Sequence, residues 1–303
     1  MLFNRLFPFC LIKRIHTTAM ANSKFEYVKS FETEDTLLRN CWIVVRVDGK
    51  GFHKFSKVHE FDKPNDARAL RLMNKAATVV MQEYKDIVIA YGHSDEYSFV
   101  LRKEAMIYNR RKDKIMTYLN SLFTSAYVYF WKDYFPSLKM KYPPAFDSRV
   151  VLYPCDEDLR NYLSWRQADC HINNLYNTAF WALVLKGGST NSEAEKTLSG
   201  TVSSEKHEIL FTQFDINYNN EPVLYKKGTI LLRKTIPHPV HGKRRQVIFP
   251  FHEDLIQQSF WQTHTNILIG EVSQVYAYPH KEKLPNLVLQ QLHLCDKIEE
   301  ENQ

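Results

Sequence analysis

The stretch that most constrains the fold is Ile87–Leu101, which predicts a β-hairpin. Two runs of β-branched and aromatic residues flank Gly92-His-Ser, and such a break between apolar runs is typical of paired antiparallel strands. Asp95 and Glu96 stand where the second strand leaves the turn. Two carboxylates in an otherwise apolar hairpin are costly to bury without a partner. Either this turn is exposed and solvated, or it holds a cation.

A second apolar stretch, Cys41–Lys50, helps to choose between these alternatives. It predicts another buried strand, and it too ends in a carboxylate, Asp48, which is followed by Gly49. Phosphoryl-transfer enzymes hold divalent metal with core strands that each bring an aspartate to one edge of a sheet. The sequence therefore favours a metal site. Gly49 and Gly51 also bracket a turn whose backbone N–H groups are candidates to face an anion, although most such turns bind no ligand.

Composition allows a large folded core but does not by itself indicate a partner. The 303 residues are 44% hydrophobic and 14% aromatic, which is enough for one large domain or two modest ones. No stretch reaches the roughly 18 uninterrupted apolar residues of an integral membrane span. The five cysteines show no paired short spacing, so neither a zinc site nor a disulfide framework is indicated.

The basic excess lies mainly at the N-terminus. The net charge is +6, but residues 1–24 hold four of the 40 Lys and Arg residues and no acid, so the remainder is nearly balanced. This leader is also apolar and resembles a mitochondrial presequence more than a secretory signal. The alternative is a disordered leader before a second start at Met20. The sequence leaves the location open between the mitochondrion, the cytoplasm and both.

The order of elements after the leader predicts an α+β fold. Helical apolar spacing separates predicted strands at 41–48, 87–101 and 149–153. Strand, helix, strand, strand, helix, strand is the order of a ferredoxin-like split βαβ sheet. We therefore expect residues 25–154 to form a mainly antiparallel, ferredoxin-like sheet with flanking helices.

The rest of the chain predicts a mostly helical domain at 155–268 and a tail at 269–303. A long helix from Leu159 to about residue 186 carries a polar face that the formation of a core does not explain, because asparagine is a poor helix former. We interpret this face as a contact for a nucleotide or nucleic acid. The residues that share it are Gln167, His171, Asn174 and Thr178.

A basic cluster precedes the helix predicted from residue 115. Arg111 and Lys114 are three residues apart, so one helical turn can present both cations. Such a run usually forms a solvated surface. Beside a metal site, a clamp for a triphosphate becomes a competing interpretation.

Four segments together resemble the eukaryotic tRNA-histidine guanylyltransferase family, which are 3′-to-5′ polymerases. The resemblance covers roughly residues 20 to 265, and its last segment is the most specific. The family usually has Arg at the position of Lys50 and often Asn at that of Gly51. The segments are Val45-Arg-Val-Asp-Gly-Lys-Gly-Phe-His53, Lys63-Pro-Asn-Asp66, Ala90-Tyr-Gly-His-Ser-Asp-Glu-Tyr-Ser-Phe99 and Ser164-Trp-Arg-Gln-Ala-Asp-Cys-His-Ile-Asn-Asn-Leu-Tyr-Asn177.

This resemblance implies a palm-like catalytic domain with the two-metal chemistry of polymerases. ATP activates the 5′-monophosphate of tRNA-His, and the 3′-hydroxyl of GTP then attacks that phosphate and expels AMP. One guanosine is thereby added, and pyrophosphate is removed later. A homotetramer is also implied, because the anticodon and the acceptor end of a tRNA are far apart.

The resemblance further assigns residues to these roles. Two Mg²⁺ ions would be held by Asp48, the Gly49 carbonyl and Asp95. Glu96 would be a supporting catalytic carboxylate, since neighbouring strand residues point to opposite faces. Contacts to tRNA would come from Gln167, His171, Asn174 and Lys206. Contacts to GTP and ATP would come from Asp48, Gly49, Lys50, Gly51, Phe52, His53, Asp66, Ser94, Asp95, Arg111 and Lys114.

Two other functions compete with this prediction. One is a repair polymerase that acts on truncated 5′ ends of tRNAs, although relatives with that role lack part of the helical motif found here. The other is a non-catalytic tRNA-binding scaffold. A lost carboxylate would indicate a scaffold, but both Asp48 and Asp95 are present.

Overall fold

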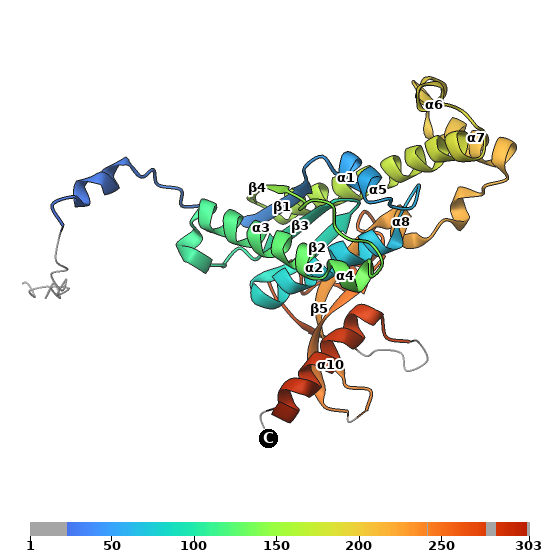
Figure 1. The fold of residues 1–303 in the computed structure, drawn as a ribbon. Coiled ribbons are helices and arrows are strands. Elements are labelled where there is room, and N and C mark those ends of the chain that lie inside the picture. Colours follow the sequence, from blue (N-terminus) through green and yellow to red (C-terminus); the bar gives the residue numbers. More distant parts are fainter. Residues whose placement is uncertain (1–22, 241, 277–282, 302–303) are drawn as a thin grey trace, which may run out of the picture. The chain divides into compact units, whose positions relative to one another are not determined.

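The structure is a computed structural model that describes residues 23–240, 242–276 and 283–301 (Figure 1). The chain divides into two units, Met1–Asp35 and Thr36–Gln303. In the first unit the described residues form a short 3-10 helix, η1 (Glu26–Phe31), which contains no buried residue. The predicted leader, apart from its last two residues, lies outside the described residues.

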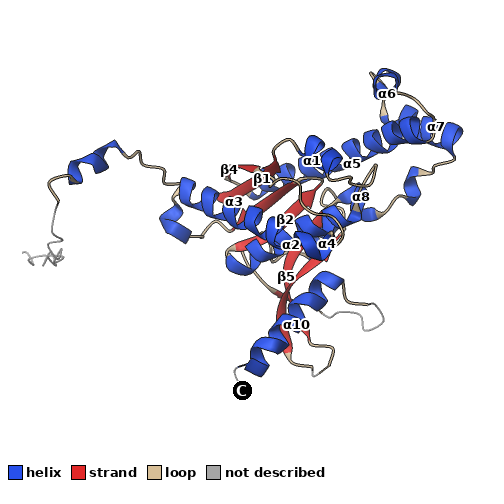
Figure 2. Ribbon diagram, in the orientation of Figure 1, coloured by secondary structure: helices blue, strands red, loops and turns tan. Residues whose placement is uncertain are grey.

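The second unit is built on one sheet with the strand order β4-β1-β3-β2-β5-β6 (Figure 2). Neighbours along this path are antiparallel, and the short strand β7 pairs with β5 in parallel. The strands are β1 (Trp42–Gly49), β2 (Ile87–His93), β3 (Glu96–Leu101), β4 (Phe146–Tyr153), β5 (Thr229–Pro237), β6 (Arg244–Phe251) and β7 (Gln274–Val275).

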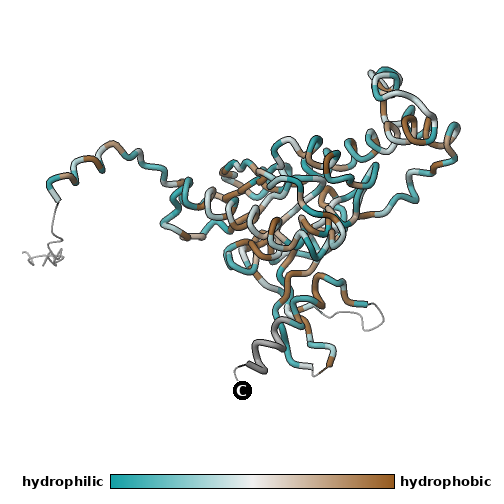
Figure 3. Tube along the Cα trace, in the orientation of Figure 1, coloured by the Kyte–Doolittle hydropathy of each residue, from teal (hydrophilic) through white to brown (hydrophobic). Residues whose placement is uncertain are grey.

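Helices cover both faces of this sheet, which confirms the predicted α+β class. Hydrophobic and hydrophilic residues alternate along these helices (Figure 3), as expected for helices with one face on a core. The helices of the first half are α1 (Phe52–Val58), α2 (Ala67–Glu83), the 3-10 helix η2 (Ile107–Arg110), α3 (Lys112–Tyr129) and α4 (Trp131–Tyr134). Those of the second half are α5 (Asp156–Leu185), α6 (Asn191–Leu198), α7 (Ser203–Phe214), the 3-10 helix η3 (Tyr218–Asn220), α8 (Val223–Lys227), α9 (Gln258–Thr263) and α10 (Asn286–Glu301).

The apolar run in β1 is continuous because both of its faces are buried. Ile43, Val45 and Val47 pack into a core with α2 and α3. Trp42 and Val44 point the other way, into a second core that includes the first half of α5. Successive strand residues point to opposite faces, so a run without polar alternation marks a central strand.

The second half of α5 supports a separate small core together with α6, α7 and η3. Figure 1 shows α5 extending from the sheet to these helices. A single 30-residue helix therefore connects the sheet with a peripheral helical lobe.

The C-terminal region is less purely helical than the sequence predicts. It adds β5 and β6 to the sheet, and β5 pairs with β2 through Ala90 and Leu231. The domain predicted to be mostly helical thus contains two long strands, of which β6 begins at Arg244. The polar start of β6 and its Pro250 conceal a strand whose Val247, Ile248 and Phe249 are all buried.

The segment predicted as a tail contains β7 and α10. Helix α10 packs on β6, with Val288 and Leu292 in the second core. The Gln291 amide accepts a hydrogen bond from Ile248 N and donates one to Ile248 O, both at 2.8 Å. The Gln291 side chain thus satisfies backbone hydrogen-bonding groups of an edge strand. No local sequence pattern predicts this role. Among the described helices, none is long and apolar enough to cross a membrane.

Candidate active site

Two strand ends bring Asp48 and Asp95 to one edge of the sheet. Asp48 lies near the end of β1, and Asp95 lies in the turn between β2 and β3. The backbone joins them, since Gly49 N donates to Asp95 O at 3.0 Å. Ser94 adopts a positive φ of 50°, and its hydroxyl donates to Asp95 Oδ1 at 3.0 Å. A strained turn residue therefore orients the carboxylate predicted as the main ligand.

The two carboxylates lie in an environment that disfavours their charge. Burial and then the charge of Glu96 raise the pKa of Asp48. Burial also raises the pKa of Asp95, the Ser94 hydroxyl opposes that rise, and Asp48 adds to it. A bound cation would relieve both effects. Oxygen donors are the ligands that Mg²⁺ prefers, so Asp48 and Asp95 fit such an ion.

No group of three or more His, Cys, Asp or Glu side chains suited to a metal occurs among the described residues. An ion held by Asp48 and Asp95 would therefore need further ligands from backbone carbonyls, water or a substrate. Magnesium sites in nucleotide enzymes commonly have this character, with one or two carboxylates plus substrate phosphates.

Glu96 is buried and paired, unlike its neighbour. Its carboxylate lies 3.0 Å from His93 Nε2 and 3.1 Å from Arg166 Nη1. Burial alone would raise the pKa of Glu96, but His93 and Arg166 hold it below its ordinary value. Glu96 is also the register partner of Asp48 across β1 and β3. The sequence did not single out either partner of Glu96.

The turn after Asp48 uses two of its backbone N–H groups within the chain, and its contact with an anion stays a prediction. Gly49 N–H is bonded to Asp95 O, and Lys50 N–H donates to Ala145 O at 2.9 Å. Gly51 has a φ of 66° and precedes α1, a backbone conformation that favours glycine. Gly49 is needed for a different reason, because a Cβ there would lie 2.3 Å from the Phe52 ring. The glycines shape a tight turn, and Phe52 packs into the core beneath it.

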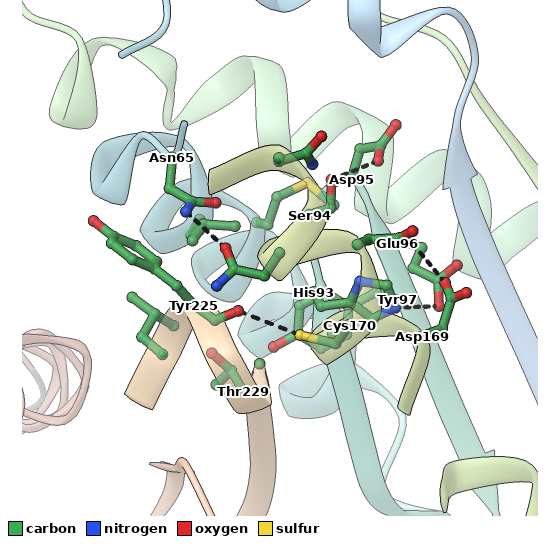
Figure 4. A pocket seen from close by; sticks show the side chains of 18 of the residues that line it. Asn65, His93, Ser94, Asp95, Glu96, Tyr97, Asp169, Cys170, Tyr225 and Thr229 are labelled. Atoms are coloured by element: carbon green, nitrogen blue, oxygen red, sulfur yellow. Dashed lines mark hydrogen bonds and ion pairs between the residues drawn. The ribbon is translucent and has the colours of Figure 1, made fainter. Parts of the chain in front are cut away.

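Two cavities meet at Ser94 and Asp95. The first measures about 260 Å³ and the second about 500 Å³, and both turn residues line both. Figure 4 shows the first, with Asp95 and Glu96 on one side and Asn65 and Tyr225 on the other. Two compartments open onto one carboxylate, which suits a reaction that brings two nucleotide groups together.

The second cavity contains several of the predicted nucleotide contacts. Phe52, His53 and Asp66 line it together with the shared turn. Asp66 caps α2, and its oxygens already accept bonds from Arg68 and from Asp62 N. Burial would raise the pKa of Asp66, yet the Arg68 hydrogen bond keeps it below its ordinary value. The other wall is aromatic, and its members are Phe61, Tyr127, Tyr176, Phe180 and Trp181.

The polar face of α5 turns mostly inward. Gln167 is 3% exposed, and its amide bonds to Lys227 O, Glu253 O and Leu255 N. It has no surface to offer a tRNA, which contradicts the predicted contact. Its physical role is to satisfy three backbone groups of the adjoining loops.

Asn174 is also internal, at the junction of three elements. It accepts a bond from Asn65 and donates one to the Tyr218 hydroxyl, both at 2.9 Å. It lines the first cavity with Asn173 and Asn177. The asparagine-rich motif therefore faces the carboxylate cavity, and Asn65, Asn173 and Asn177 are site residues that sequence reasoning missed. Their clustering was visible, but the direction in which they face was not.

His171 and Lys206 lie on the helical lobe. His171 is exposed and makes an edge contact with the Tyr218 ring at 5.6 Å. Burial and the nearby His207 lower the pKa of His171. Lys206 Nζ donates to both Thr201 O and Thr201 Oγ1 at 2.7 Å. Of the predicted tRNA contacts, His171 is the most accessible.

Arg111 and Lys114 are not brought to the carboxylates. They begin α3 beside Arg110, which bonds to Leu37 O and Cys41 O near the start of β1. Asp48 stands at the other end of that strand, about 20 Å away at ~3.3 Å per residue. Neither Arg111 nor Lys114 lines the two cavities. Within one chain the predicted triphosphate clamp is therefore not formed.

Comparisons with known proteins identify the family of this chain. A family model described as tRNAHis guanylyltransferase matches residues 25–154, and one described as the Thg1 C terminal domain matches 157–269. A probable tRNA(His) guanylyltransferase of Drosophila melanogaster is 56% identical over 93% of this chain and 97% of its own length. The chain belongs to the tRNA-histidine guanylyltransferase family.

Two further comparisons extend this assignment. A tRNA(His) guanylyltransferase of Schizosaccharomyces pombe is 55% identical over 80% of this chain and 96% of its own. The crystal structure of the Saccharomyces cerevisiae enzyme matches with 51% identity and a TM-score of 0.66 over 74% of this chain and 95% of that one. A bacterial Thg1-like protein in complex with ATP shares the fold at 20% identity and a TM-score of 0.62, covering 81% and 95% of the two chains.

Proposed function

We propose that this chain adds one guanosine to the 5′ end of tRNA-His. An oxygen of the 5′-monophosphate first attacks the α-phosphorus of ATP, which gives an adenylylated end and releases pyrophosphate. The 3′-oxygen of GTP then attacks the RNA phosphorus, a new P–O bond forms, and the bond to AMP breaks. The observation that carries this proposal is the meeting of two cavities at Asp95, beside Asp48. One compartment can receive the RNA end and the other the nucleotide.

The residues at this edge of the sheet have different roles in the proposed reaction. Asp48, Asp95 and the Gly49 carbonyl would hold two Mg²⁺ ions, which when bound lower the pKa of an attacking hydroxyl and neutralise phosphate charge. Ser94 orients Asp95 through its hydroxyl. The aromatic wall with Phe180 and Trp181 can stack on a nucleobase. Positioning of the two reacting groups at one edge supplies the rest.

The test supplies 5′-monophosphorylated tRNA-His, ATP, labelled GTP and Mg²⁺. We expect label at the 5′ end, dependent on ATP, and absent after Asp95→Ala. Undiminished labelling by that variant would contradict the site. A 5′-truncated tRNA serves as the second substrate, since faster extension of it would favour a repair polymerase. Binding of tRNA without any labelling would favour a scaffold.

The wider setting of the enzyme is also proposed. His171 and Lys206 are the surface candidates for tRNA, and His171→Ala should weaken tRNA use more than GTP binding. A homotetramer would allow different copies of the chain to hold the two ends of one tRNA, and sedimentation tests this oligomeric state.

The basic leader suggests a mitochondrial form of the protein, and a start at Met20 suggests a cytoplasmic form. Fluorescent fusions that begin at each start distinguish the two.

A further inference from the structure

Arg166 lies directly behind the carboxylate edge. It is on α5 and only 5% exposed. Its Nη1 lies 3.1 Å and 3.3 Å from the two oxygens of Glu96, so the ion pair joins the helix to the first residue of β3. The exposed Trp165 ring stacks on the guanidinium, whose central carbon is 3.5 Å from the ring centroid. Arg166 is thus fixed by packing as well as by charge.

Glu96 would otherwise compete with the two aspartates. It faces Asp48 in the strand register and follows Asp95 in sequence. Three carboxylates so close together could offer a cation more than one arrangement. Arg166 and His93 engage the Glu96 oxygens, and removal of one partner of a buried pair leaves an uncompensated charge.

We propose that Arg166 is a positioning residue that holds Glu96 against α5, so that Asp48 and Asp95 alone present oxygens to the metal. This inference rests on the metal site of the proposed function. It assigns Glu96 to orientation rather than to metal binding. It also explains why an arginine sits beside the asparagine-rich motif, because the same helix then fixes both the cavity wall and the carboxylate edge.

The first experiment compares Arg166→Met, Glu96→Gln and the double variant. Residues that support a metal site from outside its ligands typically change metal affinity or activity by about 10–100-fold when removed. We expect Arg166→Met to lower kcat within that range with little change in the KM for GTP. The double variant should regain activity relative to Arg166→Met, because the released carboxylate is then gone. Additive losses would overturn the proposal, as would a higher KM with unchanged kcat.

A second readout does not depend on the reaction. Free Mn²⁺ is titrated by electron paramagnetic resonance as a probe of the carboxylate site. Asp95→Asn should abolish this binding, whereas Glu96→Gln should weaken it by less than about tenfold, the low end for an outer-shell partner. Equal losses in the two variants would make Glu96 a ligand and overturn the inference. Absence of Mn²⁺ binding by the unaltered protein would instead contradict the metal site itself.

Controls separate positioning from folding. Arg160 is another arginine of α5, but it contacts Gln258 and Trp261 instead of the carboxylates. Arg160→Met should leave kcat within about twofold, as expected for a substitution outside such networks. Arg166→Lys should recover part of the activity, since it keeps the charge and loses the planar fork. If Arg166→Met lowers the melting temperature and Arg166→Lys restores stability without any activity, the positioning role is wrong.

Discussion

The two ends of β1 carry the two most conspicuous charged clusters of the first domain, and they differ in kind. At one end Asp95 lines two cavities and Asp48 lies near it, in surroundings that raise the pKa of both carboxylates. At the other end Arg110 is buried against backbone carbonyls, while Lys114 is exposed. The role of a cluster of like charges can therefore be inferred only when the groups that surround it are known.

The largest difference between the two ends of β1 is expected for a substitution of Asp95. Asp95→Asn should lower guanylyl transfer by about a thousandfold or more, because a metal supplies several kcal/mol of transition-state stabilisation. It should not destabilise the fold, since burial and Asp48 already disfavour the charge. Labelled-GTP transfer and thermal unfolding measure the two effects. A large loss of stability would mean that the carboxylate is structural.

At the basic end the largest effect should be on folding. Arg110 donates to Ala105 O, Lys103 O and Leu37 O, and is 1% exposed. Arg110→Met should reduce the free energy of unfolding by about 3 kcal/mol, since buried carbonyls lose charged donors. Urea unfolding tests this. An unchanged urea midpoint would show that the buried Arg110 does not stabilise the fold, and the proposed difference between Arg110 and the neighbouring cations would then be wrong.

The neighbouring cations should matter much less to a single chain. The double variant Arg111→Ala/Lys114→Ala should change GTP affinity by less than about threefold, because charges some 20 Å away are screened by salt. Fluorescence titration with a labelled GTP measures it. A loss of tenfold or more would show that these residues reach a nucleotide from another copy of the chain.

A further effect on stability, smaller than that of Arg110, is expected at Asp66. Burial would raise the pKa of Asp66, but hydrogen bonds from Arg68 and from backbone N–H groups hold it below its ordinary value. Because the pKa of Asp66 is lower in the folded state than in the unfolded state, its ionised carboxylate stabilises the fold when the pH is above the unfolded-state pKa. This stabilisation is lost as the pH falls below about 4. Asp66→Asn keeps a residue that can cap the helix but removes the charge that pairs with Arg68, so it should cost about 1 kcal/mol at pH 7. Unfolding at pH 7 and pH 3.5 should show the difference shrinking in acid.

The strands and the carboxylates could be predicted because their signals are local. Both apolar stretches form central strands, and their ends bring Asp48 and Asp95 to one edge of the sheet. The inward turn of Gln167 could not be predicted, because its partners at Lys227, Glu253 and Leu255 are distant in sequence. A polar helical face has the same spacing whether it meets solvent, RNA or the backbone of a loop.

By itself the sequence determined the family, the central strands and the residues with the chemistry for metal, since these depend on residue type and short spacing. Only the tertiary structure decided which of those residues meet. It brought the asparagine motif to the carboxylate cavity and kept Arg111 and Lys114 away from it. It also paired Glu96 with Arg166, 70 residues apart. Hydrogen bonds and ion pairs act over a few ångströms, so chain reversals and strand register decide them.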